Sequence, residues 1–129
     1  MAKGRIMAHT TYDASSPQAL RLRKAAGKYI ARLRKEAGLT QREVAVYLDL
    51  DYYTFISQLE HGAGRVPPHL YVRLAECLGL VPEDFVKQMV RYYDPFTYAG
   101  LFGQHPYDLS DKELEAAVAS TPRRLKDTC

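Results

Sequence analysis

Residues 38–62, GLTQREVAVYLDLDYYTFISQLEHG, constrain the fold of this chain most, because they predict two short helices joined by a tight turn. The Thr40 hydroxyl can cap the first helix, and we expect Asp51 to cap a second helix at residues 52–61. Each helix has an apolar stripe at helical spacing, formed by Val44, Ala45 and Leu48 and then by Phe55, Ile56 and Leu59. Gly62 is expected to end the second helix.

Outside the apolar stripes, this segment carries uncharged side chains that can donate or accept hydrogen bonds. They are Gln41, Tyr52, Tyr53, Thr54, Ser57 and Gln58. Such groups at the start of a helix have the chemistry needed to contact base edges in a DNA groove. The amide of Gln58 can form two hydrogen bonds with the N6/N7 edge of adenine, and its alternative is to be solvated. Tyr53 could instead pack on a neighbouring helix, and Thr54 could help to cap its own.

The net charge of +3 is unevenly distributed along the chain. Residues 1–40 carry nine Lys or Arg residues against two acidic residues, whereas residues 41–93 and residues 94–129 each have a net charge of −2. This asymmetry is typical of a protein with one face for a polyanion, and a solvated helix face is the alternative. The candidate phosphate contacts are Arg32, Lys35, Arg42 and Arg65.

The rest of the chain predicts further helices and no strand, so we expect an all-α fold. Ser16 and Pro17 mark the start of a long helix that ends at Gly38 and whose first two turns extend beyond the core. Two more helices are expected at about residues 68–78 and 82–93, each with apolar residues at helical spacing.

These patterns divide the chain into three parts. Residues 1–15 are polar and aperiodic and are expected to form a flexible arm, and residues 16–93 are expected to form the helical domain. Residues 94–129 contain an aromatic, glycine-rich connection, then a short helix that begins with the capping box Ser110-x-x-Glu113, then a polar tail.

Three motifs of the helical domain together resemble a known family. They are RLRKEAGLTQREVA at residues 32–45, ISQLEHG at residues 56–62 and RLAECLGL at residues 73–80. The run from about Ile30 to Leu80 resembles the lambda-repressor-like, or Cro/cI-type, helix-turn-helix domain of the Xre family of bacterial and phage regulators. The resemblance implies a five-helix lambda-repressor-like DNA-binding domain at residues 16–93, with its helix-turn-helix core at residues 40–62 and a small C-terminal helical extension. The turn differs from the family pattern, since Asp49-Leu50-Asp51-Tyr52 holds one residue more.

The resemblance also implies roles for individual side chains. Helix 52–61 would enter the major groove, and the helix before it would lie across the DNA backbone. Base contacts would come from Gln41, Tyr53, Thr54, Ser57 and Gln58. Arg34 and Glu60 match an ion pair that ties the first helix to the end of the third, and Arg65 matches a basic residue that contacts phosphate.

Other patterns exclude several classes of function. The four histidines show no metal-ligand spacing, and no phosphate-binding loop or nucleophile motif occurs, so we expect no metal, no cofactor and no enzymatic activity. Cys77 and Cys129 form no disulfide framework, which indicates a reducing compartment. No apolar run is long enough to span a bilayer, and the N-terminus lacks the apolar centre of a secretory signal. We therefore expect a cytoplasmic, nucleoid-associated protein.

The expected partner is a double-stranded DNA operator, bound by a homodimer that acts as a transcriptional repressor. The aromatic segment 92–107 is expected to be partly core and partly a self-association or protein-binding surface. Other functions stay open at this point: an antitoxin that also regulates its own operon, a protein–protein adaptor that retains the fold, and a nonspecific nucleoid-coating protein.

Overall fold

The computed structural model describes residues 13–125, where the chain folds into seven α-helices and two short 3-10 helices. The α-helices are α2 (Pro17–Glu36), α3 (Gln41–Tyr47), α4 (Thr54–Glu60), α5 (Tyr71–Cys77), α6 (Pro82–Tyr93), α7 (Pro95–Phe102) and α8 (Asp111–Ala119); the 3-10 helices are η1 (Pro68–Leu70) and η2 (Pro106–Asp108). Extended pairing within residues 13–125 is limited to one isolated bridge between Leu80 and Arg124. The prediction of an all-helical fold is confirmed for this range. Most of the expected flexible arm lies outside it.

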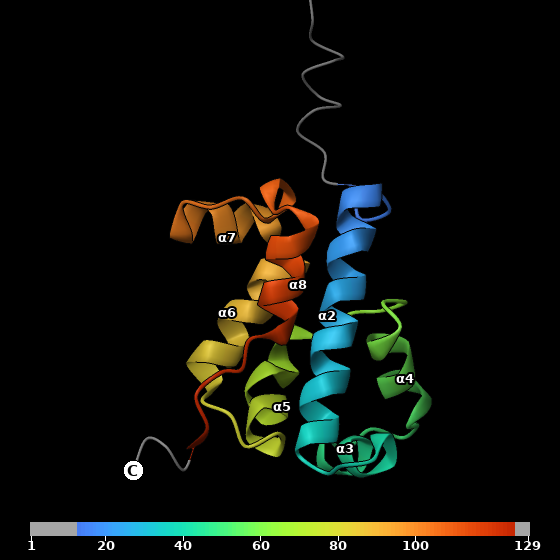
Figure 1. Cartoon of the computed structure of the whole chain (residues 1–129). Helices are drawn as coiled ribbons and strands as arrows, with labels where there is room; N and C mark the ends of the chain where they lie inside the picture. The colour runs from blue at the N-terminus through green and yellow to red at the C-terminus, as the bar shows by residue number, and fades with distance from the viewer. Residues whose placement is uncertain (1–12, 126–129) are drawn as a thin grey trace, which may run out of the picture.

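The central helix of the fold is α2, with α4 on one side and α8 on the other (Figure 1). It begins as the sequence predicts, because Ser16 Oγ accepts the Ala19 N–H at 3.1 Å and Pro17 lies in the first turn. Gly38 follows its end with a φ of 74°, a left-handed conformation that costs glycine little. The expectation that the first turns of α2 extend beyond the core is wrong, because Ala19 and Leu22 are buried.

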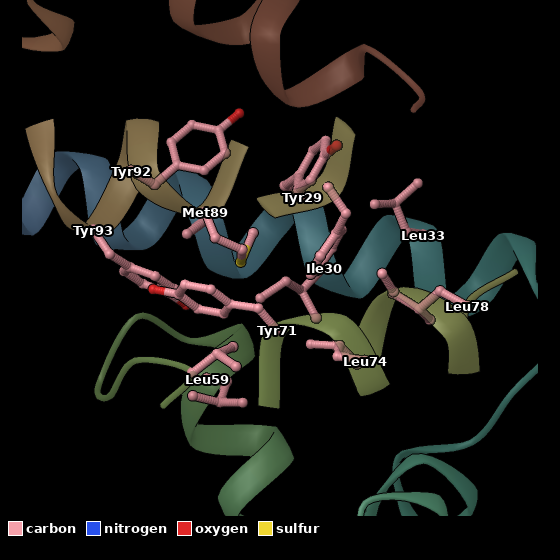
Figure 2. Close-up of a cluster of buried hydrophobic side chains, with 14 of the residues drawn as sticks. Tyr29, Ile30, Leu33, Leu59, Tyr71, Leu74, Leu78, Met89, Tyr92 and Tyr93 are labelled. Atoms are coloured by element: carbon pink, nitrogen blue, oxygen red, sulfur yellow. The ribbon is translucent and has the colours of Figure 1, made fainter. Parts of the chain in front are cut away.

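Aromatic side chains fill the centre of the core, between α2, α5 and α6 (Figure 2). The Tyr29 ring stacks on Phe85 at a centroid distance of 6.2 Å and lies 5.7 Å from the ring of Tyr92. Met89 and Leu74 complete this centre, and both are buried. Burial raises the pKa of the Tyr92 hydroxyl to about 12. The close packing fixes α5 and α6 against α2, which is the helix that also carries α4.

The helices expected at residues 68–78 and 82–93 are present, the first as η1 followed by α5 and the second as α6. The segment after α6 was expected to be a connection without helix, and this prediction is wrong. Pro95 occupies the first turn of α7 rather than ending the helical structure, and Gly103, with a φ of 74°, ends that helix. The Ser110 capping box is confirmed at the start of α8.

The polar tail that follows α8 is anchored to the domain as far as residue 125. The Arg123 carbonyl accepts the Val81 N–H at 2.7 Å, and the Leu125 N–H donates to the Gly79 carbonyl at 3.0 Å. The Arg123 guanidinium binds Asp84 through two hydrogen bonds of 2.9 Å. These contacts hold the C-terminal segment across the start of α6, on the side away from α4 (Figure 1).

Candidate nucleic-acid interface

Helices α3 and α4 are joined by a turn whose conformation is set by one residue with a positive φ. The Thr40 capping box is present as predicted, with Thr40 Oγ1 accepting the Glu43 N–H at 3.0 Å and Glu43 Oε1 accepting the Thr40 N–H at 2.9 Å. Hydrogen bonds from the Thr40 backbone N–H and from the Thr40 side chain to the carboxyl group lower the pKa of Glu43. Asp49 then adopts a φ of 56°, and the Leu50 N–H donates back to the Ala45 carbonyl at 2.9 Å. Leu50 packs against the core, as expected of the apolar residue in this turn.

The start of α4 differs from the prediction. Asp51 was expected to cap a helix at residues 52–61, but Asp51 is exposed in a bend and α4 spans Thr54–Glu60. The residue at the cap position is Tyr53, and its side chain makes no capping hydrogen bond. The longer turn after Asp49 moves the helix start two residues along the chain, so the capping potential of the Asp51 carboxylate is not used.

The end of α4 packs directly on the middle of α2, at a glycine. A Cβ atom at Gly27 would lie 2.7 Å from the Leu59 carbonyl oxygen and closer still to that of Glu60. Both of those atoms belong to the backbone, so no side-chain rotation could make room for a methyl group. Gly27 is therefore required for the close approach of the two helices, and the approach fixes how α4 is presented.

An ion pair and an amide join α2, α3 and α4 at the same point. Arg34 Nε donates to Glu60 Oε2 at 2.6 Å, and Arg34 Nη2 donates to Glu60 Oε1 at 3.0 Å. Gln41 Nε2 donates to Glu60 Oε1 at 2.9 Å. The geometry agrees with the Arg34–Glu60 pair that the resemblance implied. It gives Gln41 a contact that the sequence did not indicate, since its amide nitrogen orients the start of α3 against the end of α4.

The opposite side of α4 is not covered by the rest of the described chain. Thr54 and Gln58 are exposed and Ser57 is half-buried, while Ile56 and Leu59 point into the core. Within residues 13–125, no hydrogen-bond partner is found for the side chains of Thr54, Ser57 or Gln58. These three of the five groups predicted to contact bases therefore lie along one side of α4 without a side-chain partner in the described range, whereas Gln41 is bonded to Glu60.

Tyr53 and Arg42 form a stacked pair beside the start of α4. The Arg42 guanidinium carbon lies 4.7 Å from the centroid of the Tyr53 ring, within the range of a cation–π contact. Tyr53 is 44% exposed and its neighbour Tyr52 is 75% exposed. The Arg42 guanidinium and the phenol groups of Tyr52 and Tyr53 are thus exposed near the N-terminal end of α4.

The basic residues of α2 fall into two chemical groups that the sequence did not separate. All four arginines bind other parts of the protein: Arg21, Arg23, Arg32 and Arg34. The three lysines are exposed and have no hydrogen bond or ion pair within the described range: Lys24, Lys28 and Lys35. Planar guanidinium groups suit fixed multidentate contacts, whereas lysine acts as a mobile point charge. The arginines of α2 hold the fold together, and its lysines remain available for a polyanion.

Two of the residues predicted to contact phosphate are hydrogen-bonded within the described chain. Arg32 donates to the Val118 carbonyl at 2.9 Å, to the Ser120 carbonyl and to Glu36, so its guanidinium joins α2 to the end of α8. Arg65 donates to Asp94 Oδ2 at 3.0 Å and to the Tyr71 hydroxyl at 2.9 Å. Because these donors are already bonded, we leave both residues out of the proposed interface.

Sequence patterns also missed one exposed apolar side chain near this surface. Val46 lies on α3 and is 70% exposed, although its neighbours Val44 and Ala45 are buried. Projecting α3 as a helical wheel would have separated Val46 from the core stripe. Tyr47, on the next position, is 46% exposed and lies under the Arg73 guanidinium.

Two further properties of the described range bear on what the chain can bind. A search of residues 13–125 finds no cluster of three or more histidine, cysteine or acidic side chains that could hold a metal ion. In the same range no helix has the length and hydropathy needed to cross a lipid bilayer.

Residues 25–86 match a family model described as a helix-turn-helix domain. The match begins in the middle of α2, includes α3, the turn and α4, and ends in α6. The chain therefore contains a helix-turn-helix DNA-binding domain. Comparison with curated proteins gave no match, and neither did comparison with solved structures.

Proposed function

We propose that this protein is a sequence-specific regulator of transcription that inserts α4 into the major groove of double-stranded DNA. The observation that supports the proposal most is the free polar side of α4, formed by Thr54, Ser57 and Gln58. The Arg42 guanidinium, stacked on Tyr53, lies beside the start of this helix, so uncharged hydrogen-bonding groups and a positive charge occur together. In this arrangement α3 lies across the DNA backbone, and Gln41 is held at its start by Glu60.

The contacts are proposed to divide between specificity and affinity. Gln58, Thr54 and Ser57 face the bases, with Tyr53 and Gln41 at the edge of the same surface. Lys35 and Arg42 contact phosphates, since both are exposed and neither has an ion pair within residues 13–125. Phosphate contacts add affinity without sequence information.

We further propose a lambda-repressor-like arrangement of α2–α6, and a homodimer that represses by covering a promoter in a bacterial or phage genome. One recognition helix contacts too few base pairs to define a site, and two-fold dimers bind half-sites about 34 Å apart. The proposed location is the cytoplasm, on the nucleoid.

A second candidate function is supported by α7. Leu101 is 67% exposed, and Phe96 and Phe102 are 56% and 46% exposed, although Tyr92, Tyr93 and Tyr98 from the same aromatic segment are buried. Exposed apolar side chains on one short helix suit a protein partner or the dimer contact. The alternative is therefore an antitoxin that binds a toxin through α7 and regulates its own operon. A protein–protein adaptor would use α7 without DNA.

The proposal is tested by selecting bound fragments from random double-stranded DNA with the full chain, then repeating the selection with Gln58→Ala. A palindromic motif is expected, with preference lost at one position in each half-site, at a cost of about 1–3 kcal/mol in binding free energy. Gln104→Ala is the matched control, since Gln104 is exposed between α7 and η2. If the selection enriches no motif even at low salt, that result contradicts sequence-specific binding. Co-purification of a small partner lost on Leu101→Asp favours the antitoxin.

A further inference from the structure

A groove of about 750 Å³ runs along α2, with α8 as its other wall and no residue of α4 in its lining. Its floor is apolar, with contributions from Leu20 and Ala25 of α2 and from Leu114 and Val118 of α8. The groove extends from Pro17 to Arg32, about 22 Å at 1.5 Å per residue, which is the length of a helix of four turns. In Figure 1 α4 and α8 flank α2 from different sides, in agreement with a groove lining that holds no residue of α4.

The charged residues along the groove differ in whether they are already paired. Arg21 donates to the Leu109 carbonyl at 3.0 Å and to Asp111 at 2.9 Å, and Arg32 binds the end of α8. These two arginines attach the two ends of α8 to α2. They fix the separation of the walls and are not available for a ligand.

Two lysines on one wall stay without a partner. Lys24 and Lys28 are one helical turn apart on α2, both are exposed, and neither forms an ion pair within residues 13–125. On the opposite wall Glu115 is the acidic side chain without an ion pair in that range. The unpaired charges of the groove are therefore positive on balance. They border an apolar floor in which Leu20 is 37% exposed.

From this combination we infer that the α2–α8 groove binds an acidic amphipathic helix of a partner protein. Apolar side chains of that helix would cover Leu20, Ala25 and Val118, and glutamates or aspartates on its flank would pair with Lys24 and Lys28. Helix-in-groove recognition depends on apolar anchors at i, i+3, i+4 and i+7 spacing, which a floor of this length can accept. A DNA backbone would satisfy the lysines but would leave the apolar floor without a contact.

The test uses the full chain and a synthetic helical peptide of about 16 residues, long enough to form a marginally stable helix. Leucines follow the i, i+3, i+4, i+7 spacing and glutamates flank them; a second peptide carries lysines in place of the glutamates. Binding is measured by fluorescence anisotropy. We expect the glutamate peptide to bind and the lysine peptide to bind at least tenfold more weakly.

Variants then locate the site. Lys28→Glu is expected to weaken binding of the glutamate peptide at least tenfold, whereas Lys112→Glu, the same charge change on the outer side of α8, leaves it within twofold. The double variant Lys24→Glu/Lys28→Glu is expected to prefer the lysine peptide. Leu20→Asn is expected to weaken binding of the glutamate peptide to the wild-type charges and of the lysine peptide to the double variant. Its thermal unfolding should fall only slightly, because Leu20 is partly exposed.

Three results would overturn the inference. The first is that the wild-type chain binds neither peptide, or binds both equally. The second is that Lys112→Glu is as harmful as Lys28→Glu. The third is evidence for a different occupant of the groove. A second copy of the chain is indicated if sedimentation shows dimers that Lys24→Glu/Lys28→Glu dissociates. DNA is indicated if the double variant loses DNA affinity and the glutamate peptide does not bind to the wild-type chain. If the chain fails to bind DNA, the groove proposal is not affected, because no residue of α4 lines the groove.

Discussion

The Arg34 guanidinium and the Glu60 carboxylate form a two-point ion pair, at 2.6 and 3.0 Å, between the last turn of α2 and the last residue of α4. Their side chains are only 11% and 5% exposed. The same carboxylate also accepts a hydrogen bond from Gln41 at 2.9 Å. One buried group thus sets the positions of all three helices that present the proposed DNA-binding surface.

Glu60→Ala is therefore expected to destabilise the fold by about 3 kcal/mol, because it leaves the Arg34 charge buried without a partner. The preference among DNA sequences should change less than the stability does, since Glu60 is buried and contacts the proposed surface only through Gln41. Urea unfolding measures the first quantity, and selection from random DNA measures the second. The double variant Arg34→Met/Glu60→Leu should be less destabilised than Glu60→Ala, since no unpaired charge remains. Unchanged stability with an altered site would contradict this assignment.

Gly27→Ala should destabilise the protein, although helix propensity alone predicts that it would stabilise it. In an exposed helix this change stabilises by up to about 1 kcal/mol, but here the new methyl group would overlap the backbone carbonyls at the end of α4. We expect a loss of about 1–3 kcal/mol in thermal unfolding and a further loss of DNA affinity as α4 shifts. Gly100→Ala on α7 is the control, because a Cβ there meets no atom within 4 Å. Equal effects of the two substitutions would argue against the close contact.

Much of the fold could be predicted because its helix ends are encoded locally. Ser16, Thr40 and Ser110 cap helices as their sequence neighbourhoods indicate, and Pro82 lies in the first turn of α6. The apolar stripes of α3 and α4 follow the helical period, so Val44, Ala45, Ile56 and Leu59 are found in the core. Each of these features depends on residues within about four positions of one another.

The parts that failed depend on more than local sequence. Asp51 has the right side chain for a cap, but the left-handed turn at Asp49 and the burial of Leu50 place the helix start later. The segment after α6 was expected to be a connection without helix, but Pro95, which follows the end of α6, also begins α7. The role of Arg32 could not be seen, because its partners at Val118 and Ser120 are more than 80 residues away in the sequence.

Salt dependence should separate the free lysines of α2 from its bonded arginines. If Lys35 contacts a phosphate, Lys35→Ala weakens DNA binding about equally for every sequence and lowers the slope of log K against log salt by about 0.9. Lys112→Ala, which removes the same charge from α8, should leave the slope unchanged. Arg32→Ala should reduce stability instead, since it breaks bonds to the end of α8. These outcomes are measured by anisotropy at several salt concentrations. An unchanged slope for Lys35→Ala would remove it from the interface.

The contact between Asp84 and Arg123 predicts a pH dependence for the anchored tail. Hydrogen bonds from the Arg123 side chain and backbone lower the pKa of Asp84 from 3.8 to about 2. Because the folded-state pKa is the lower one, the contact stabilises the protein above about pH 4, and this contribution is lost as the pH falls towards 2. The contribution should be small, since Arg123 is largely exposed and solvent screens the pair. Thermal unfolding of wild type and Asp84→Asn should converge between pH 4 and pH 2, and parallel profiles would contradict the prediction.

The turn before α4 offers the most local test of how the recognition helix is placed. Asp49 has a φ of 56°, which costs a β-branched residue about 1–2 kcal/mol, so Asp49→Val should destabilise by about that amount. Asp49→Gly should be at least as stable as wild type, because glycine adopts this conformation without strain. Asp51→Val is the control, since Asp51 is exposed in the same turn without a positive φ.

The ion pair of Asp49 with Arg73, at 3.2 Å, has to be separated from the backbone effect. Both side chains are largely exposed, so the pair should contribute less than about 1 kcal/mol. Arg73→Ala measures the loss of the Arg73 side chain, including its hydrogen bond to the Tyr47 carbonyl at 2.7 Å, and keeps the residue at Asp49. If Asp49→Val and Arg73→Ala are equally harmful, the ion pair rather than the left-handed turn holds α4. If only Asp49→Val unfolds more easily and binds DNA more weakly, the turn geometry sets the position of α4, as the Leu50 to Ala45 hydrogen bond indicates.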